Sequence, residues 1–177
     1  QKYPNYKKVA ANVIGKDSGN WFNVFLIDKG KKDGIEKDMN VMAGNGLVGI
    51  VIDVGPHYAK VRSIIDDTSK VSGMVLSTSG NCIVNGDLQA MNDNCEITFK
   101  NLKDADDKVK KGDQVVTSYV SDKFLQGFLI GYVSETEMDS NNITKSGTIT
   151  PAADFEHLRE VLVILDKKTD ATSDTEK

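Results

Sequence analysis

A pattern that occurs twice limits the folds open to this chain. Residues 35–41 (IEKDMNV) are soon followed by GLVGIV at 46–51, and residues 109–115 (VKKGDQV) are followed by GFLIGYV at 127–133. In each copy a charged turn leads into an apolar strand, then a loop, then a hydrophobic strand flanked by glycine. The repetition predicts two similar β-units, and it contains no catalytic apparatus.

The two copies align with one insertion. Ile35 against Val109 gives an offset of 74 residues, and Gly49 against Gly131 gives 82. The eight extra residues of the second copy fall at 119–126, between the two strands of that copy. Insertions are tolerated in loops, so this spacing favours a pair of duplicated β-barrels.

Strand signals cover most of the chain. Short β-branched and aromatic runs are bounded by turn residues, which is typical of a sandwich or a small barrel. The predicted strands are 9–14, 21–27, 39–42, 47–54, 59–65, 71–76, 81–84, 95–99, 114–118, 128–133, 143–150 and 161–165. We therefore expect an all-β fold of two small six-stranded antiparallel β-barrels in tandem.

The junction between the barrels is expected at 66–70. We predict an N-terminal remnant at 1–8, barrel one at 9–67, barrel two at 68–166 and a disordered tail at 167–177, which has no apolar anchor. The one helical feature expected is a short turn near 152–159, capped near Asp154. Whether the first strand closes its own barrel or crosses to the second is open.

Four glycines are candidate structural residues. Gly46, Gly49, Gly127 and Gly131 stand where a strand follows a tight connection or where a small barrel bends. Glycine tolerates positive φ and close backbone approach, so we interpret them as turn and bend residues. A phosphate loop would need a helix after the glycines, and strands follow here.

Composition excludes several classes of function. The net charge is −4 and the pI is near 5.2, and the lysine-rich segments 29–32 and 108–111 have aspartates beside them. They are interpreted as solvated turns and not as a nucleic-acid surface. No apolar stretch reaches the roughly 18 residues of a membrane span, and the polar start lacks the apolar core of a signal peptide. The chain does not begin with Met, so we expect a fragment or a processed chain.

Neither a metal site nor a cofactor is expected. The two cysteines, Cys82 and Cys95, flank a turn at 85–87, and two distant histidines complete no metal-ligand spacing. Free, partly buried thiols are the preferred interpretation of the cysteines. A disulfide across paired strands remains open, because sequence does not give their separation.

The residues needed for hydrolysis are present but not in a recognisable arrangement. Ser118 is a conceivable nucleophile, and His57 and His157 are the possible bases, yet no nucleophile motif surrounds Ser118. Five aspartates could in principle act as general acids or bases: Asp66, Asp67, Asp104, Asp106 and Asp107. We interpret them as solvated charges in turns. We predict that the chain is not an enzyme.

The order and spacing of several short motifs resemble the extracytoplasmic region of the rod shape-determining protein MreC. The resemblance covers roughly residues 9–165. It departs at Tyr119, where the family usually has Gly, and at Leu125, where the family has Pro. The motifs are residues 11–14 leading to Trp21, then 27–30, 34–35, 46–51, 61–66, 111–113 before 116–118, and 127–131.

The resemblance implies a non-enzymatic scaffold of the cell-elongation machinery of a rod-shaped bacterium. Such a protein crosses the membrane once, and a membrane helix and a dimerising coiled coil would precede Gln1. Its barrels lie outside the cell membrane and organise peptidoglycan synthesis. The partners implied are a class B penicillin-binding protein, MreD, RodA and the MreB filaments, with self-association into dimers or filaments and no cofactor.

The alternative is another periplasmic or cell-surface binding module, such as a carbohydrate-binding β-domain, which would use exposed aromatics. Trp21 and Phe22 are adjacent in a predicted strand and should point to opposite faces, while Tyr58, Tyr119 and Tyr132 are scattered. For the scaffold, we expect the first barrel and the crevice between the barrels to accept the transpeptidase. The apolar density of residues 21–27 and 46–54 motivates this hypothesis, but the sequence does not identify the contact residues.

Overall fold

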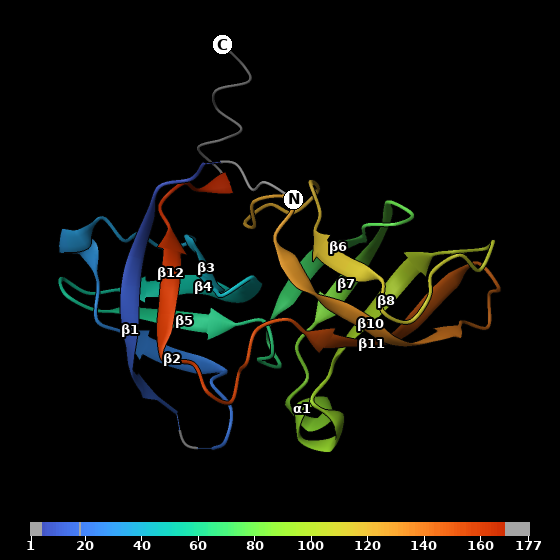
Figure 1. Ribbon diagram of the computed structural model, residues 1–177, viewed down its shortest axis with the longest axis horizontal. Coiled ribbons are helices and arrows are strands. Elements are labelled where there is room, and N and C mark those ends of the chain that lie inside the picture. The colour runs from blue at the N-terminus through green and yellow to red at the C-terminus, as the bar shows by residue number, and fades with distance from the viewer. Residues whose placement is uncertain (1–4, 18, 169–177) are drawn as a thin grey trace, which may run out of the picture.

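Two closed antiparallel β-barrels make up the computed structural model, which describes residues 5–17 and 19–168 (Figure 1). The first barrel has the strand order β1-β12-β3-β4-β5-β2. Its strands are β1 (Lys8–Lys16), β2 (Val24–Ile27), β3 (Asn40–Ala43), β4 (Gly46–Val54), β5 (Ala59–Ser63) and β12 (Glu160–Ile164), with a 3-10 helix, η1 (Lys31–Asp33), after β2.

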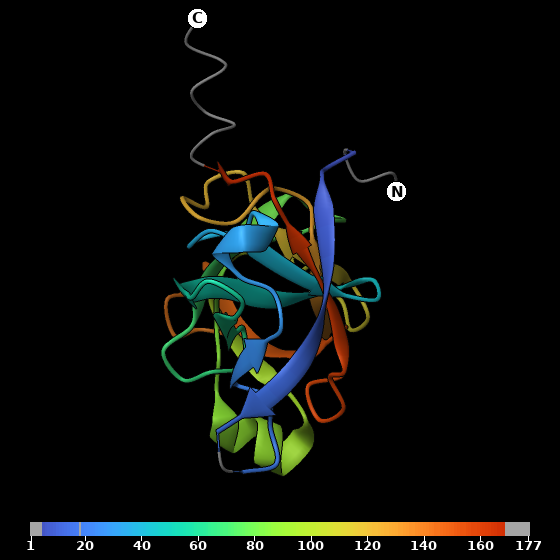
Figure 2. The same cartoon turned by 90° about the vertical axis from the view of Figure 1, so that its left-hand side faces the viewer.

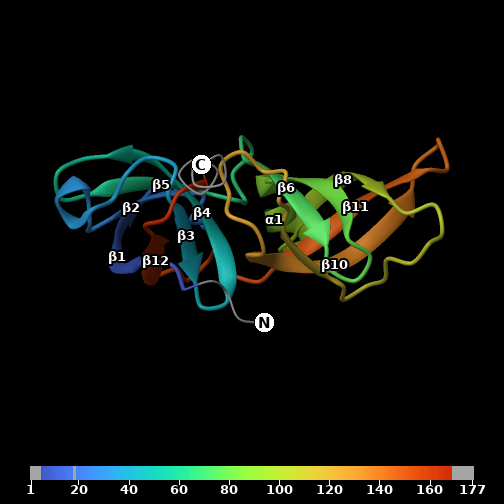
Figure 3. The same ribbon diagram turned by 90° about the horizontal axis from the view of Figure 1, so that it is seen from above.

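The second barrel has the order β10-β11-β8-β7-β6-β9 and lies beside the first along the long axis of the molecule (Figure 3). Its strands are β6 (Lys70–Val75), β7 (Gly80–Asn85), β8 (Ile97–Lys103), β9 (Gln114–Thr117), β10 (Leu129–Met138) and β11 (Thr144–Pro151), and α1 (Leu88–Asn94) joins β7 to β8. The predicted fold of two six-stranded barrels is confirmed.

The repeat seen in the sequence corresponds to two hairpins, β3–β4 and β9–β10, whose strands pair in the same register. Val41 pairs with Gly49 in the β3–β4 hairpin, and Val115 pairs with Gly131 in the β9–β10 hairpin. Directly after these pairs both ladders shift by one residue, which is a β-bulge. The two hairpins therefore bend at equivalent positions.

The glycine in each hairpin allows the next strand to approach. A Cβ atom added at Gly49 would lie 2.0 Å from the carbonyl oxygen of Arg62 on β5. A Cβ atom at Gly131 would lie 2.1 Å from the carbonyl oxygen of Thr150 on β11. Real Cβ atoms do not come so close to a backbone oxygen, so both positions require the missing side chain.

The turn before each hairpin also repeats. The backbone amide of Asp38 donates to the carbonyl of Val51 at 2.9 Å, and the amide of Gly112 donates to Val133 at 2.7 Å. Asp38 has φ +73° and Gly112 has φ +92°. The second copy therefore has glycine where the first accepts an aspartate in the left-handed region, which Asp tolerates better than most residues.

One strand position is filled from different parts of the chain in the two barrels: by the last strand of the chain in barrel one, and by the first strand of the inserted unit in barrel two. β12 lies between β1 and β3, and β6 takes the same place between β7 and β9. Figure 2 shows β12 running beside β1. The predicted extent of barrel two, 68–166, is therefore wrong at its end, because β12 returns to barrel one. The whole of barrel two is inserted between β5 and β12, and β1 closes its own barrel.

Other expectations change in detail. Residues 152–159 form turns and bends without a helix, although the carboxylate of Asp154 does accept the amide of Glu156 at 3.1 Å. The α-helix is instead at 88–94, where Asp87 caps its first turn by accepting the amide of Ala90 at 2.9 Å. Trp21 precedes β2 and is not part of it.

The two ends of the predicted domain scheme are only partly described. Lys8 already belongs to β1, and the carbonyl of Lys7 accepts the amide of Leu165 at 2.8 Å, so this part of the predicted N-terminal remnant belongs to barrel one. Lys167 and Lys168 are described. The rest of the predicted disordered tail, residues 169–177, lies outside the described residues.

Candidate functional site

The β9–β10 loop of barrel two, which carries the eight extra residues, packs against barrel one. Asn40, at the start of β3 in barrel one, is 1% exposed. Its side-chain oxygen accepts the amide of Leu125 at 2.8 Å, and its side-chain nitrogen donates to the carbonyl of Lys123 at 3.0 Å. One buried side chain of barrel one thus satisfies two backbone groups of the β9–β10 loop in barrel two.

Internal hydrogen bonds also order this loop. The hydroxyl of Thr117 donates to the carbonyl of Leu125 at 2.6 Å and accepts the amide of Phe128 at 2.8 Å. The hydroxyl of Ser121 accepts the amide of Phe124 at 3.1 Å, and Phe124 and Leu125 are buried. The loop is therefore a packed connection between the barrels.

Replacing Asn40 with alanine is expected to weaken the joint between the barrels. The change leaves the Leu125 amide and the Lys123 carbonyl without their partner in a buried place, which costs about 2 kcal/mol. Hydrogen exchange should accelerate at the amides of 123–125, and the thermal midpoint should fall. Asn94→Ala, at an exposed asparagine of α1, is the control, and equal effects of the two changes would contradict this role for Asn40.

Further contacts join the barrels elsewhere. The indole nitrogen of Trp21 donates to the side-chain oxygen of Asn92 on α1 at 2.7 Å. Tyr6 meets Phe128 edge to face, with ring centroids 5.9 Å apart. The barrels are thus joined at several separate places, which fixes their relative orientation.

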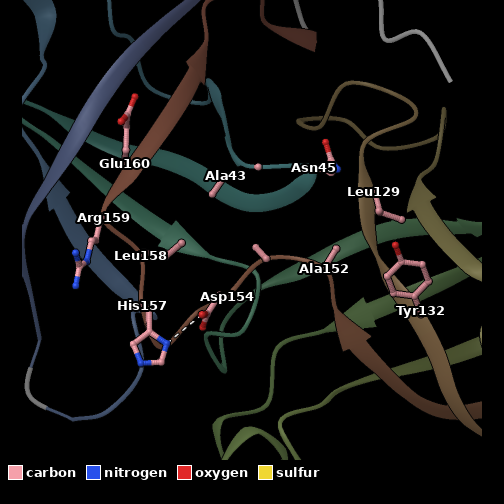
Figure 4. A pocket seen from close by; sticks show the side chains of 12 residues that line it. Ala43, Asn45, Leu129, Tyr132, Ala152, Asp154, His157, Leu158, Arg159 and Glu160 are labelled. Atoms are coloured by element: carbon pink, nitrogen blue, oxygen red, sulfur yellow. Dashed lines mark hydrogen bonds and ion pairs between the residues drawn. The ribbon is translucent and has the colours of Figure 1, made fainter.

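A groove lies where the chain crosses back from barrel two to barrel one through residues 152–159 (Figure 4). It has a volume of about 480 Å³. Barrel one contributes the β3–β4 turn with Asn45, and barrel two contributes Leu129 and Tyr132 of β10. Both barrels therefore line one concave surface, and Tyr132, 39% exposed, can be reached from solvent.

The crossing segment lines the groove with polar groups. Asp154 and His157 form an exposed ion pair at 3.0 Å if the imidazole is protonated, and Arg159 and Glu160 follow them. The other side chains that line the groove are apolar: Ala43, Leu129, Ala152, Ala153 and Leu158. Protein-binding surfaces commonly combine apolar and polar side chains in this way.

The β3–β4 turn also borders a second, smaller hollow of about 200 Å³. Gly44 and Asn45 line both hollows. The second one is more apolar, with lining residues that include Tyr6, Met42, Phe128, Leu162 and Ile164. The two hollows therefore lie next to each other, with the β3–β4 turn between them.

The residues considered for hydrolysis do not meet. The Ser118 hydroxyl donates to the side-chain oxygen of Asn81 at 2.8 Å. His157 pairs with Asp154, and His57 is exposed in the turn between β4 and β5. Among the described residues, Ser118 makes no hydrogen bond to either histidine, so they form no serine–histidine pair.

The interpretation of the five aspartates as solvated turn charges is wrong for two of them, Asp66 and Asp104, which are buried. Asp66 is buried and accepts the side-chain nitrogen of Asn23 at 3.0 Å and the amide of Thr68 at 3.1 Å. Burial alone would raise the pKa of Asp66, but hydrogen bonds from Thr68 and Asn23 hold it below its ordinary value. Asp67 accepts the first amide of α1, from Leu88, at 2.8 Å. Both carboxylates order the junction between the barrels.

Asp104 is also buried, and it pairs with a lysine. It accepts the amides of Lys108 and Val109 at 2.9 Å each and lies 2.9 Å from the ammonium of Lys145, which also contacts Asp107. Burial alone would raise the pKa of Asp104, but these amides and Lys145 lower it. Burial would lower the pKa of Lys145, but Asp107 and Asp104 raise it. Asp106 is exposed, as predicted.

The cysteines are both free, but only one is buried. Cys82 lies in β7, where burial raises the pKa of its thiol to about 12, while Cys95 is exposed at the end of α1. They do not face each other across the strands. No group of three His, Cys, Asp or Glu side chains that could hold a metal ion occurs among residues 5–17 and 19–168.

The remaining predicted glycines lie at the hairpin turns. A Cβ atom at Gly46 would lie 2.6 Å from the amide nitrogen of Ala153, so the crossing segment packs directly on this turn. Gly127 has φ +90°, which glycine adopts without strain. The roles of Asn40, Lys145 and the 152–159 segment were not predicted from the sequence, because they depend on contacts between the barrels or across a barrel.

The family model of "Rod shape-determining protein MreC, barrel core" matches residues 13–165. The chain belongs to this family. The cell shape-determining protein MreC of Listeria monocytogenes is 33% identical over 173 residues, which is 96% of this chain and 57% of that protein. The chain thus spans less than two thirds of this MreC relative.

Solved MreC structures share the fold. The structure of MreC from Listeria monocytogenes is 34% identical and has a TM-score of 0.79, covering 90% of this chain and 76% of that one. The complex between penicillin-binding protein 2 (PBP2) and MreC from Helicobacter pylori contains a chain with a TM-score of 0.62 and 15% identity, covering 90% and 100%, which shows the fold alone. Within the described part of this MreC chain, no helix has the length and apolarity to span a membrane.

Proposed function

We propose that this chain is the extracytoplasmic, non-enzymatic scaffold region of a membrane-anchored cell-elongation protein. It maintains rod shape by organising peptidoglycan synthases, with a class B penicillin-binding protein as the direct partner. Contacts with MreD and RodA, a link to MreB filaments, and self-association belong to the same proposal. Membership of the MreC family supports it, as does the complex that an MreC of the same fold forms with PBP2 in Helicobacter pylori.

The observation that carries the proposal is the groove between the barrels. Its walls come from both barrels, which the crossing segment and the hydrogen bonds of Asn40 hold together. A preorganised concave surface loses little conformational freedom when a partner binds, which favours a scaffold role. Single aromatics at separate places, such as Tyr58, Tyr119 and Tyr132, give weaker support to the carbohydrate-binding alternative.

Filling the groove with charge tests the proposal. The double change Asn45→Arg and Tyr132→Arg places two long cations on opposite walls, at exposed positions where the fold tolerates them. We expect affinity for a purified class B penicillin-binding protein to fall at least about tenfold, which corresponds to roughly 1.4 kcal/mol. Pull-down followed by surface plasmon resonance provides the measurement.

Ile143→Arg is the matched control. Ile143 is 54% exposed and lies in the β10–β11 loop, outside the groove. It should leave binding unchanged. Wild-type affinity in the groove variant, or an equal loss in the Ile143 variant, would remove the groove as the binding surface. Binding of oligosaccharide that Tyr132→Arg abolishes would favour the carbohydrate-binding alternative.

A further inference from the structure

A second pocket lies at the other crossing between the barrels, where residues 64–69 lead from β5 to β6. It has a volume of about 340 Å³ and shares no lining residue with the groove. Barrel one, the crossing segment and the eight-residue insertion all contribute to it. Its cationic side chains are Lys37, Arg62, Lys70 and Lys123.

The charge of this pocket differs from that of the chain. Four cations face one lining carboxylate, Asp38, which lies 3.8 Å from Lys123. In the described part of the chain, no acidic group lies within ion-pair distance of Lys37, Arg62 or Lys70. The whole chain carries a net charge of −4. Positive charge is thus concentrated at one concave place on an acidic protein, which attracts anionic ligands.

Neighbouring acidic groups offset only part of the positive charge of the pocket. Asp66 is close enough for its negative charge to act on Arg62, but among the described residues Lys37 and Lys70 have no carboxylate within ion-pair distance. Glu36, next to Lys37 in sequence, faces Lys167 at 3.5 Å. Asp122 is exposed beside Lys123, and it does not line the pocket. The remaining cations are available to a ligand.

The pocket also has an apolar wall and hydroxyl groups. Ile50, Ile52 and Phe124 form the wall, and Thr68 and Ser69 lie at its edge. The four cations come from four separate segments around this wall. A single phosphate prefers amides and cations that converge on one point. Dispersed cations around an apolar wall fit an extended ligand that carries several negative charges and an apolar group.

We propose that this pocket binds an acidic peptide segment of a partner protein, in which carboxylates flank an apolar side chain. The carboxylates would pair with Lys37, Lys70 and Lys123, and the apolar side chain would lie against Phe124 and Ile52. The pocket is separate from the groove proposed for the penicillin-binding protein, so the two surfaces can act independently. The insertion that distinguishes the second copy of the repeat supplies Lys123 and Phe124.

Fluorescence anisotropy with a labelled peptide of alternating glutamate and leucine tests this proposal, with a lysine–leucine peptide as the charge control. The whole chain is compared with the double variants Lys37→Glu with Lys70→Glu, and Lys100→Glu with Lys111→Glu. All four lysines are exposed, so both variants should fold, and both change the net charge equally. Only the first pair lines the pocket.

The acidic peptide is expected to bind in a salt-dependent way, and the pocket variant should weaken it at least about tenfold. The control variant should bind within about twofold of wild type, and the lysine–leucine peptide should not bind. No binding of the acidic peptide, or an equal loss in the two variants, would overturn the proposal. Displacement of the peptide by inorganic phosphate, but not by acetate at the same ionic strength, would also overturn it in favour of a phosphate site.

Discussion

Alanine at Gly49 is expected to destabilise the chain by about 3 kcal/mol, because the fold cannot move the opposing backbone away from the new methyl group. The Cβ atom would lie 2.0 Å from the carbonyl oxygen of Arg62 and 2.7 Å from the Cα of Ser63. Both atoms belong to β5, which is held in the barrel by its pairing with β4 and β2. For a chain of this size the thermal midpoint should fall by roughly 6–12 °C.

Two further alanine variants complete this test. Gly131→Ala should cost about as much, because its Cβ atom would lie 2.1 Å from the carbonyl of Thr150 at the equivalent place in barrel two. Gly15→Ala is the control, since no atom lies within 4 Å of the added Cβ and its φ is not positive. If the Gly49→Ala and Gly15→Ala variants had the same thermal midpoint, the requirement for glycine at the bend would be refuted.

The second large effect is expected at Lys145. The side chains of Lys145 and Asp104 are 3% and 4% exposed. Lys145→Met keeps the length and apolar stem of the side chain but removes the cation, so Asp104 retains only its two backbone donors. Breaking one side of a buried ion pair costs about 3 kcal/mol. Urea unfolding measures the change, and Lys100→Met, at an exposed lysine of β8, should cost far less.

The effect of Lys145→Met should depend on pH. The folded pKa of Asp104 is lowered, so its contribution is present above the unfolded value of about 3.9 and is lost as pH falls through the folded pKa. The folded pKa of Lys145 is raised, so its contribution is present below about 10.4 and is lost as pH rises through the folded pKa. The difference between wild type and Lys145→Met should be constant near neutral pH and shrink in acid. A difference that grew on acidification would contradict the ion pair.

The repeated pattern allowed the fold to be predicted because each copy encodes a hairpin with its own turn and bend. Gly49 and Gly131 lie at equal places in that hairpin, and the insertion falls in the loop between β9 and β10. These features depend on neighbouring residues, so they can be predicted from alternating apolar and polar residues and from the turn residues between the strands. Most strand boundaries consequently agree with the predicted ranges within about two residues, but β2 begins at Val24 and not at 21, β8 extends to Lys103 and not to 99, and β10 extends to Met138 and not to 133.

The features that were missed depend on partners far away in the chain. Glu160–Ile164 reads as one more strand, and nothing local shows that it pairs with β1. Lys145 stands in a polar strand, and only the fold brings it to Asp104. Asn40 lies in a predicted strand, and nothing local shows that the loop at 123–125 packs against it. The groove is lined by residues 43–45, 129–132 and 152–160, which only the fold brings together, so its lining could not be predicted.

Hydrogen–deuterium exchange of the protein, alone and with a purified class B penicillin-binding protein, tests the scaffold proposal most directly. Bound partner should protect amides of three segments that line the groove: 43–45, 129–132 and 152–160. The exposed β10–β11 loop at 139–143 should exchange at the same rate in both samples. Protection confined to segments outside the groove, or no protection while the complex is shown to form, would contradict the proposal that the two barrels bind the synthase between them.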